Sequence, residues 1–327
     1  MDSVIAGYKD LHPDVTIHYV QKSFSNYENN LYGLLEEGAD SDILVPDIFR
    51  ISNAWLPKYQ KYLSSLPSSI MTSETYSETF YPTVVSDFTG KDGKIYAMPW
   101  SIDGLAVIYN KQLLEDAGIT EPPSDWDSFV EAAEKLTKRN SSGEITQAGL
   151  AIGSSNNVRH SESILSYLLL LNGADLIDST RTTVNLSSTE AEVALTVYTD
   201  FLDDETGTWS TTLKNDLELF YEGKLAMMFA PSWRAFDIIE AAPSIEFGLA
   251  PLPQLPGNDS VYYSMYWGEA VSKYCKNKAL AWDFIKYLST AEVQKELYSN
   301  ASQIRSFGEP YSRMDLAESL MDQTYVS

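Results

Sequence analysis

Cysteine, histidine and the common catalytic motifs are scarce or missing in this sequence. Cys275 is the single cysteine among 327 residues, so an internal disulfide and a structural metal cage of thiolates are excluded. The three histidines, His12, His18 and His160, do not have metal-ligand spacing. Nucleophile-elbow, Walker and dinucleotide-binding motifs are also missing from the sequence. We therefore expect no metal and no cofactor.

Positive charge and long apolar runs are scarce as well. Lys and Arg number 23 against 46 Asp and Glu, which gives a formal charge of -23. Nucleic-acid phosphates and anionic lipid headgroups repel such a chain, which argues against a nucleic-acid-binding function. The longest apolar run, Ile164 to Leu171, is too short to cross a bilayer. No basic and apolar signal segment opens the sequence, so we expect an exported form to carry its signal outside these residues.

Aromatic side chains, in contrast, are plentiful, with 21 Tyr, 7 Trp and 12 Phe. Most aromatic residues pack in cores, where they bury a large area at modest entropic cost. The same rigid faces also stack on the C–H faces of sugar rings. Composition alone does not separate these two uses.

Predicted helices and strands alternate along the chain, which indicates an α/β fold. Apolar spacing and end signals predict helices at 2–11, 25–37, 126–139, 161–171, 189–202, 213–221, from 233 onward, 279–288 and 291–298. Alternating or short apolar runs predict strands at 15–20, 47–51, 94–99, 105–109, 148–152, 226–230, 247–252 and 262–272. The length favours two domains, and without a Gly/Ser-rich linker we expect the chain to cross between them more than once.

A series of short motifs extends over nearly the whole chain. They are GKIYAMPWS at 93–101, DG at 103–104, YNK at 109–111, AGI at 117–119, PPSDW at 122–126, FYEGKLAM at 220–227, SW at 232–233, FGLAPLP at 247–253 and ALAWDFI at 279–285. Their order and spacing resemble the family 1 extracellular solute-binding proteins, the relatives of maltose-binding protein.

The resemblance implies a two-lobed periplasmic-binding-protein fold of type II, with hinge strands between the lobes and the ligand cleft between them. It places residues 1–110 and 252–295 in lobe 1, and residues 111–251 and 296–327 in lobe 2. In this family a strand usually precedes the helix at 2–11, so the first strand of lobe 1 is expected to be missing from this chain.

The resemblance also implies a function. It predicts an extracytoplasmic receptor of an ABC importer, periplasmic or lipid-anchored, that binds a sugar or oligosaccharide by hinge closure and presents it to a membrane permease. We expect a monomer without catalytic activity. A polyamine, a peptide or another small solute in the same fold is an alternative. A carbohydrate-active hydrolase is an alternative of another class, although acidic pairs such as Asp203-Asp204 are better interpreted as a solvated loop in so acidic a chain.

Three candidate ligand contacts follow from the motifs. Trp233 matches the ligand-stacking tryptophan of the family, and Asp103 matches an acidic contact of the maltose-binding branch. A carboxylate suits this role because it accepts hydrogen bonds from hydroxyls. Trp100 is expected at the cleft wall. Their structural alternatives are a core tryptophan at a helix start, a solvated turn aspartate and packing under the hinge.

The aromatic segment 262–269 contains three more candidates, Tyr266, Trp267 and Glu269. Strand alternation puts Tyr266 and Trp267 on opposite faces, so at most one of these two lines the cleft. We favour Trp267 together with Glu269, with core packing as the alternative.

Loop residues complete the predicted site. Ser52 and Asn53 follow the strand at 47–51, where capping of the next helix is the stronger interpretation. Asn156, with Asn157, follows the strand at 148–152, and Arg305 lies in a late loop that often contacts ligand in this family, although a surface arginine is the more common case. Because Arg234 and Arg305 are the main basic residues of these loops, a neutral ligand is favoured. A cationic ligand stays an alternative, because carboxylates and aromatic rings can also bind a cation.

Overall fold

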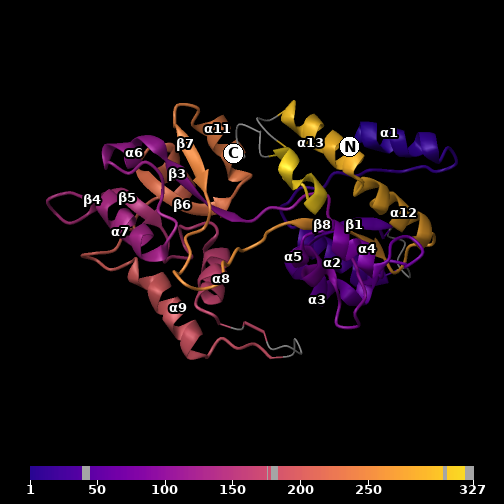
Figure 1. Cartoon of the computed structure of the whole chain (residues 1–327), viewed down its shortest axis with the longest axis horizontal. Helices are drawn as coiled ribbons and strands as arrows, with labels where there is room; N and C mark the ends of the chain where they lie inside the picture. The colour runs from indigo at the N-terminus through magenta and orange to yellow at the C-terminus, as the bar shows by residue number, and fades with distance from the viewer. Residues whose placement is uncertain (39–44, 175, 178–182, 305–307, 321–327) are drawn as a thin grey trace. The chain divides into compact units, whose positions relative to one another are not determined.

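The computed structural model describes residues 1–38, 45–174, 176–177, 183–304 and 308–320 (Figure 1). The chain divides into two compact units. The first unit contains Met1–Ile102 and Met265–Ser327, and the second contains Asp103–Ser264. The chain therefore passes from the first unit to the second and back again.

The boundaries of these units differ from the expected lobes. Strand β3 (Leu105–Asn110), expected in lobe 1, lies in the second unit because it pairs with β6 (Leu225–Pro231) and β7 (Phe247–Ala250). The return crossing comes later than expected, because Leu105 N–H still donates to Tyr263 O. Helix α13 (Ala291–Ser302) packs against α1 (Asp2–Leu11) and α12 (Lys278–Leu288), so the tail expected in lobe 2 belongs to the first unit.

The first unit contains a three-stranded sheet. β1 (Ile48–Ser52) and β2 (Leu63–Ser64) both pair antiparallel with the central β8 (Trp267–Ser272). Phe49 and Ile51 of β1 are buried, in a core that they share with residues of α2 (Tyr27–Glu37), α3 (Leu56–Tyr59), α4 (Ser73–Thr79) and α5 (Pro82–Phe88). A second cluster around Tyr8 and Phe284 joins α1, α12 and α13.

Over the described residues, one edge of β1 is open, because no strand pairs with it. Asn53 N–H donates to Tyr266 O and Ser272 N–H donates to Asp47 O, so the odd-numbered residues of β1 bond to β8. Ile48, Arg50 and Ser52 therefore direct their backbone groups to the other edge. Within the described part of the chain, the partner found there is the Tyr27 hydroxyl, which donates to Arg50 O at 2.8 Å.

Two predicted strands of the first unit are not strands in the structure. Residues 15–20 have the alternating pattern, and Val15 and Ile17 pack against the cluster around Tyr8, but no ladder forms over the described residues. Residues 94–99 form only isolated bridges at Ile95 and Met98. A strand needs a partner along its length, and local sequence does not show whether one is present.

The second unit has a five-stranded sheet in the order β4-β5-β6-β3-β7, with β4 (Lys138–Arg139) at one edge. β5 (Ile145–Ala151) and β6 run parallel, and the other pairs are antiparallel. Every residue of β6 is buried. Helix α7 (Trp126–Leu136) packs on β5 so closely that a Cβ at Gly149 would lie 1.8 Å from Ala133 O.

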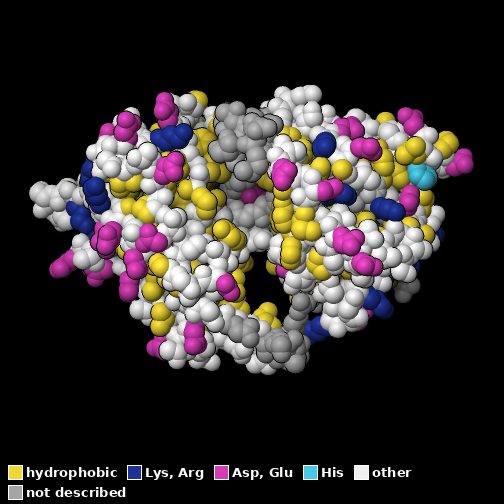
Figure 2. Space-filling model, in the orientation of Figure 1, with side chains coloured by type: hydrophobic (Ala, Val, Ile, Leu, Met, Phe, Trp, Pro, Cys, Tyr) yellow, Lys and Arg dark blue, Asp and Glu magenta, His cyan; other side chains and the backbone are white. Residues whose placement is uncertain are grey.

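Further helices complete the second unit. They are α6 (Lys111–Asp116), α8 (Ser161–Leu171), α9 (Thr189–Asp200), α10 (Asp216–Tyr221) and α11 (Arg234–Ala241). Among the described residues, no helix has both the length and the apolar character that a bilayer span requires. Acidic side chains are spread over the visible faces of both units rather than gathered in one place (Figure 2).

Candidate functional site

The first unit presents an aromatic surface, formed by Phe24, Tyr27, Trp55 and Trp267. Trp267 opens β8 opposite Ser52 in the ladder, and Trp55 ends the short helix η2 (Asn53–Trp55) that follows β1. The two indole rings meet edge to face, with centroids 5.2 Å apart, and Tyr27 stacks on Trp55 at 6.2 Å. Phe24 is 82% exposed and meets the Trp267 ring at 6.1 Å. Half-exposed rings held this way offer flat apolar area for stacking.

A charged pair lies beside this surface. Arg50 and Glu269 are partners in the β1–β8 ladder, and Arg50 Nη2 lies 2.8 Å from Glu269 Oε1. The Arg50 guanidinium also lies 4.2 Å from the centroid of the Trp100 ring. Glu269, predicted as a ligand contact, therefore has an internal partner for one oxygen. Trp100 has one face against a cation and contributes to the wall of a neighbouring pocket.

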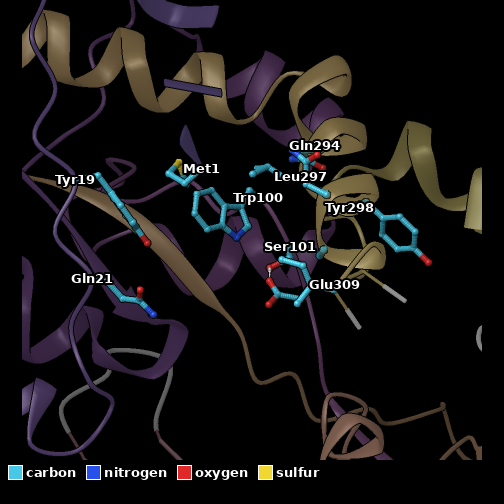
Figure 3. A pocket seen from close by; sticks show the side chains of 12 residues that line it. Met1, Tyr19, Gln21, Trp100, Ser101, Gln294, Leu297, Tyr298 and Glu309 are labelled. Carbon is cyan, nitrogen blue, oxygen red and sulfur yellow. Dashed lines mark hydrogen bonds between the residues drawn. The ribbon is translucent and has the colours of Figure 1, made fainter. Parts of the chain in front are cut away.

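That pocket, of about 510 Å³, lies wholly within the first unit (Figure 3). Tyr19, Trp100 and Tyr298 supply apolar faces, and the Ser101 hydroxyl donates to Glu309 at 3.1 Å. Gln294 is 1% exposed, and among the described residues its Oε1 has no hydrogen-bond partner. A buried acceptor without a partner is costly, and this oxygen has almost no accessible surface through which a ligand in the pocket could reach it.

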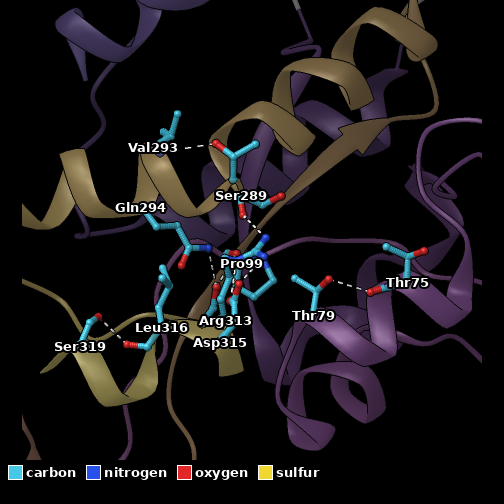
Figure 4. Close-up of polar contacts among 12 residues, drawn as sticks. Thr75, Thr79, Pro99, Ser289, Val293, Gln294, Arg313, Asp315, Leu316 and Ser319 are labelled. Carbon is cyan, nitrogen blue, oxygen red and sulfur yellow. Dashed lines mark hydrogen bonds and ion pairs between the residues drawn. The ribbon is translucent and has the colours of Figure 1, made fainter. Parts of the chain in front are cut away.

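The pocket wall is held by polar contacts (Figure 4). Gln294 Nε2 donates to Ser312 Oγ at 3.0 Å, and Ser312 Oγ donates to Pro99 O at 2.8 Å. Arg313 Nη1 donates to Ser289 O at 3.2 Å and its guanidinium pairs with Asp315. These bonds join α13, the late segment and the residue before Trp100, so the amide of Gln294 has a fixed orientation.

Three predicted residues of the first unit have structural roles instead. Tyr266 is 3% exposed and its hydroxyl donates to Asp87 at 2.7 Å, so it belongs to the core and departs from the predicted role. Ser52 caps η2 by accepting a bond from Ala54 N–H. Asn53 Nδ2 donates to Asp87 at 3.0 Å. Capping was the alternative interpretation for Ser52 and core packing the one for Tyr266, whereas Asn53, for which capping was also the alternative, bonds to the Asp87 carboxylate.

In the second unit, Asp103 is tied to the backbone beside Trp233. Its Oδ1 accepts from Gly104 N–H at 2.7 Å and from Ser232 N–H at 3.2 Å, and its Oδ2 accepts from Trp233 N–H at 3.3 Å. Burial raises the pKa of Asp103 to about 6, although the backbone donors act in the opposite direction. Asp103 is thus no solvated turn residue, and it fixes the chain just before α11.

Trp233 is 37% exposed and its ring contacts two named neighbours. The Arg234 guanidinium lies 4.1 Å from the ring centroid, and the His160 ring meets it edge-on at 6.2 Å. Arg234 Nε donates to His160 Nε2 at 3.3 Å, and Arg234 Nη1 donates to Asp237 Oδ2 at 2.6 Å. Burial and the two nearby arginines lower the pKa of His160 to about 4, so His160 is neutral near pH 7.

The remaining predicted residues are Asn156 and Arg305, and Asn156 has no described contact with Trp233 or with the aromatic surface. Asn156 is exposed and lines a second hollow of about 380 Å³, together with Asn157 and Arg159. Asn157 is mostly a structural residue, because it accepts from Trp209 Nε1 and donates to two backbone carbonyls. Arg305 lies outside the described residues.

Sequence reasoning missed Trp55, Tyr27, Phe24 and the contact between Arg234 and His160. The position of Trp55, three residues after the end of a strand, was the available signal. The residues after this strand, Ser52 and Asn53, were interpreted mainly as helix caps, and Trp55 was not considered. His160 and Arg234 are 74 positions apart, and no local pattern relates them.

Comparison with known proteins places these features in a family. The family model described as bacterial extracellular solute-binding protein matches residues 1–295. The chain belongs to this family. Its mixed α/β architecture with two sheets is the type II periplasmic-binding-protein fold, as the resemblance predicted.

Several relatives of this solute-binding protein are known. A binding protein of Brucella abortus is 24% identical over 302 residues, which cover 91% of this chain and 70% of the relative. The diacetylchitobiose binding protein DasA of Streptomyces coelicolor is 28% identical over 254 residues, which cover 74% of this chain and 56% of DasA. Among solved structures, the GacH receptor of Streptomyces glaucescens, solved unliganded and with acarbose, is 25% identical with a TM-score of 0.73, over 99% of this chain and 80% of GacH.

Proposed function

We propose that this solute-binding protein is the extracytoplasmic receptor of an ABC importer and that it binds a neutral sugar or oligosaccharide without catalysis. The observation that carries the proposal is Trp233, an indole ring that is 37% exposed and fixed by side-chain neighbours and by the Asp103–backbone bonds. A rigid, part-exposed indole face is what stacking on a pyranose requires.

Features of the first unit support the same ligand class. The aromatic surface adds two half-exposed indole rings, and the pocket beside Trp100 is lined by the rings of Tyr19, Trp100 and Tyr298. No basic residue is among the described residues that line this pocket, which disfavours an anionic ligand. DasA is a diacetylchitobiose binding protein, and GacH has been solved in complex with acarbose.

The hydrolase alternative receives no support from its carboxylate pair. Asp203 Oδ1 accepts from Glu205 N–H, Thr206 N–H and the Thr206 hydroxyl, so this carboxylate closes a surface turn. We therefore propose a receptor that hands its ligand to a membrane permease, acts as a monomer and works outside the cytoplasm. Hinge closure on the ligand, which the resemblance implies, stays a prediction.

A thermal-shift screen tests the proposal. The panel contains diacetylchitobiose, maltotriose, acarbose, simple sugars, spermidine, amino acids and sugar phosphates. A ligand at 100 times its Kd stabilises the native state by about 2.7 kcal/mol, and we expect such a shift from one sugar class. Trp233→Ala should weaken that binding about tenfold or more, because the stacking contact is lost.

Val193→Ala is the matched control, because Val193 is 45% exposed on α9 and belongs to neither candidate surface. It should bind like the original protein. A cooperative melt that no sugar shifts would contradict the proposal, and so would turnover of a chromogenic glycoside at a rate that Trp233→Ala abolishes.

A further inference from the structure

The Trp233 ring is covered on one side by its own neighbour in sequence. The Arg234 guanidinium lies 4.1 Å from the ring centroid, and the Arg234 side chain is only 18% exposed. A guanidinium over an indole face is held by the negative potential of that face. The ring therefore has one face against a cation, while 37% of the residue remains open to solvent.

Arg234 is itself fixed from two directions. Its Nε donates to His160 Nε2 at 3.3 Å, and its Nη1 donates to Asp237 Oδ2 at 2.6 Å. His160 is 8% exposed and lies at the start of α8, whereas Asp237 lies one turn further along α11. His160 also meets the Trp233 ring edge-on at 6.2 Å. Two elements that are far apart in the sequence thus hold the guanidinium against the ring.

We propose that Arg234 is a positioning and specificity-determining residue, which fixes the Trp233 ring for a neutral ligand and disfavours a cationic one. The inference rests on the proposed function, because Trp233 is taken as the stacking residue. A ring that is free to rotate would lose rotamer entropy on binding, and a pre-positioned ring does not. A ring face with a cation already on its far side has less negative potential to offer a ligand cation.

The charge of Arg234 and its shape have separate consequences. A lysine keeps the charge but has no planar fork, so it does not bridge His160, Asp237 and the ring at once. Arg234→Lys should therefore free the ring while still repelling cations. Arg234→Gln should free the ring and also remove the repulsion.

The test uses the full chain labelled with 5-fluorotryptophan and followed by fluorine NMR. Trp233→Phe assigns the Trp233 resonance. In Arg234→Lys and Arg234→Gln this resonance should move toward the position of free 5-fluorotryptophan, while the other six tryptophan resonances stay in place. Lys214→Gln, which removes one positive charge at the exposed Lys214–Glu222 pair, should leave the Trp233 resonance unchanged. This part of the test needs no ligand.

Binding supplies the second measurement. The sugar that stabilises the original protein should bind both Arg234 variants about tenfold more weakly, as expected for loss of one fixed aromatic contact. Spermidine should perturb the Trp233 resonance in Arg234→Gln at lower concentration than in Arg234→Lys.

The outcomes separate the two proposals. A Trp233 resonance that stays in place in both Arg234 variants would overturn the positioning role, whatever the sugar screen shows. Equal spermidine sensitivity in the two variants would overturn the specificity role. If no sugar binds but the resonance moves as expected, the sugar assignment fails and the positioning role stands. Should the Arg234 variants unfold, Asp237→Ala removes one support at a half-exposed position and should move the same resonance in the same direction.

Discussion

Arg50 and Glu269 face each other across the β1–β8 ladder, and the guanidinium approaches Oε1 with Nε at 2.9 Å and Nη2 at 2.8 Å. Opposite charges on directly paired residues stabilise neighbouring strands. The Glu269 side chain is 13% exposed and that of Arg50 is 35% exposed, so water screens the pair less than an ordinary surface pair. The pair connects the edge strand to the centre of the sheet.

Glu269→Gln should lower the free energy of unfolding by about 1–3 kcal/mol, because Arg50 is left part-buried without its counter-charge. Urea denaturation measures the change. Glu28→Gln is the comparison, since the Lys58–Glu28 pair has side chains 47% and 37% exposed and should contribute less than about 1 kcal/mol. Equal losses in the two variants would contradict this account.

Trp267 and Tyr266 are adjacent in the chain and should respond in opposite ways. Trp267→Ala removes a half-exposed ring of the aromatic surface and should weaken sugar binding with a small effect on stability. Tyr266→Phe removes the 2.7 Å bond to Asp87 and should destabilise the protein by about 1–2 kcal/mol with unchanged binding. Calorimetry and thermal denaturation of both variants measure the two effects. The assignment fails if Tyr266→Phe is the variant that loses affinity.

Asp103 should make stability depend on pH. Its native pKa of about 6 lies above the ordinary value near 4, so the native state holds this proton more tightly than the unfolded state. The resulting stabilisation is fully present below about pH 4 and is lost as the pH rises through 6. Over that range the original protein should lose up to about 3 kcal/mol more than Asp103→Asn. Chemical denaturation at several pH values measures the difference, and parallel curves would refute the shift.

Gly149→Ala should destabilise the second unit by about 3 kcal/mol, because the new methyl group meets Ala133 O and α7 must move away from β5. Gly33→Ala, inside α2, meets no atom within 4 Å and should stabilise the first unit by about 0.5–1 kcal/mol. Thermal denaturation gives both values. The explanation by close packing is excluded if the two substitutions have effects of the same sign.

Local signals in the sequence predicted the longer helices, but the short helices α3, α4, α5 and α6 were not predicted. Helix α1 ends at Leu11 because His12-Pro13 follows, and α8 ends at Leu171 before Asn172-Gly173, in both cases where the sequence predicted. The strands at 105–109 and 226–230 were also found within a residue or two, as β3 and β6. The segments 15–20 and 94–99 were not strands, because pairing depends on neighbours that no local window contains.

Single motif matches predicted Trp233 and Asp103 as ligand contacts, and their role in binding stays a prediction. Contacts between distant residues around the candidate site were not predictable. The sequence gives no sign that Tyr266 reaches Asp87, that Glu269 pairs with Arg50 or that Trp55 joins Trp267. Burial and pairing of this kind arise only when segments more than a hundred residues apart pack together.

The open edge of β1 has a consequence for the colloidal behaviour of the protein. Among the described residues no strand pairs with the backbone groups of Ile48 and Ser52 at this edge, so they form a template onto which a strand of a second molecule can add. At low ionic strength the net charge of -23 keeps molecules apart over a screening length of about 30 Å, which shrinks to about 3 Å in 1 M salt. The excess of acidic residues thus acts as an electrostatic barrier to aggregation, and concentrated salt should bring this chain out of solution.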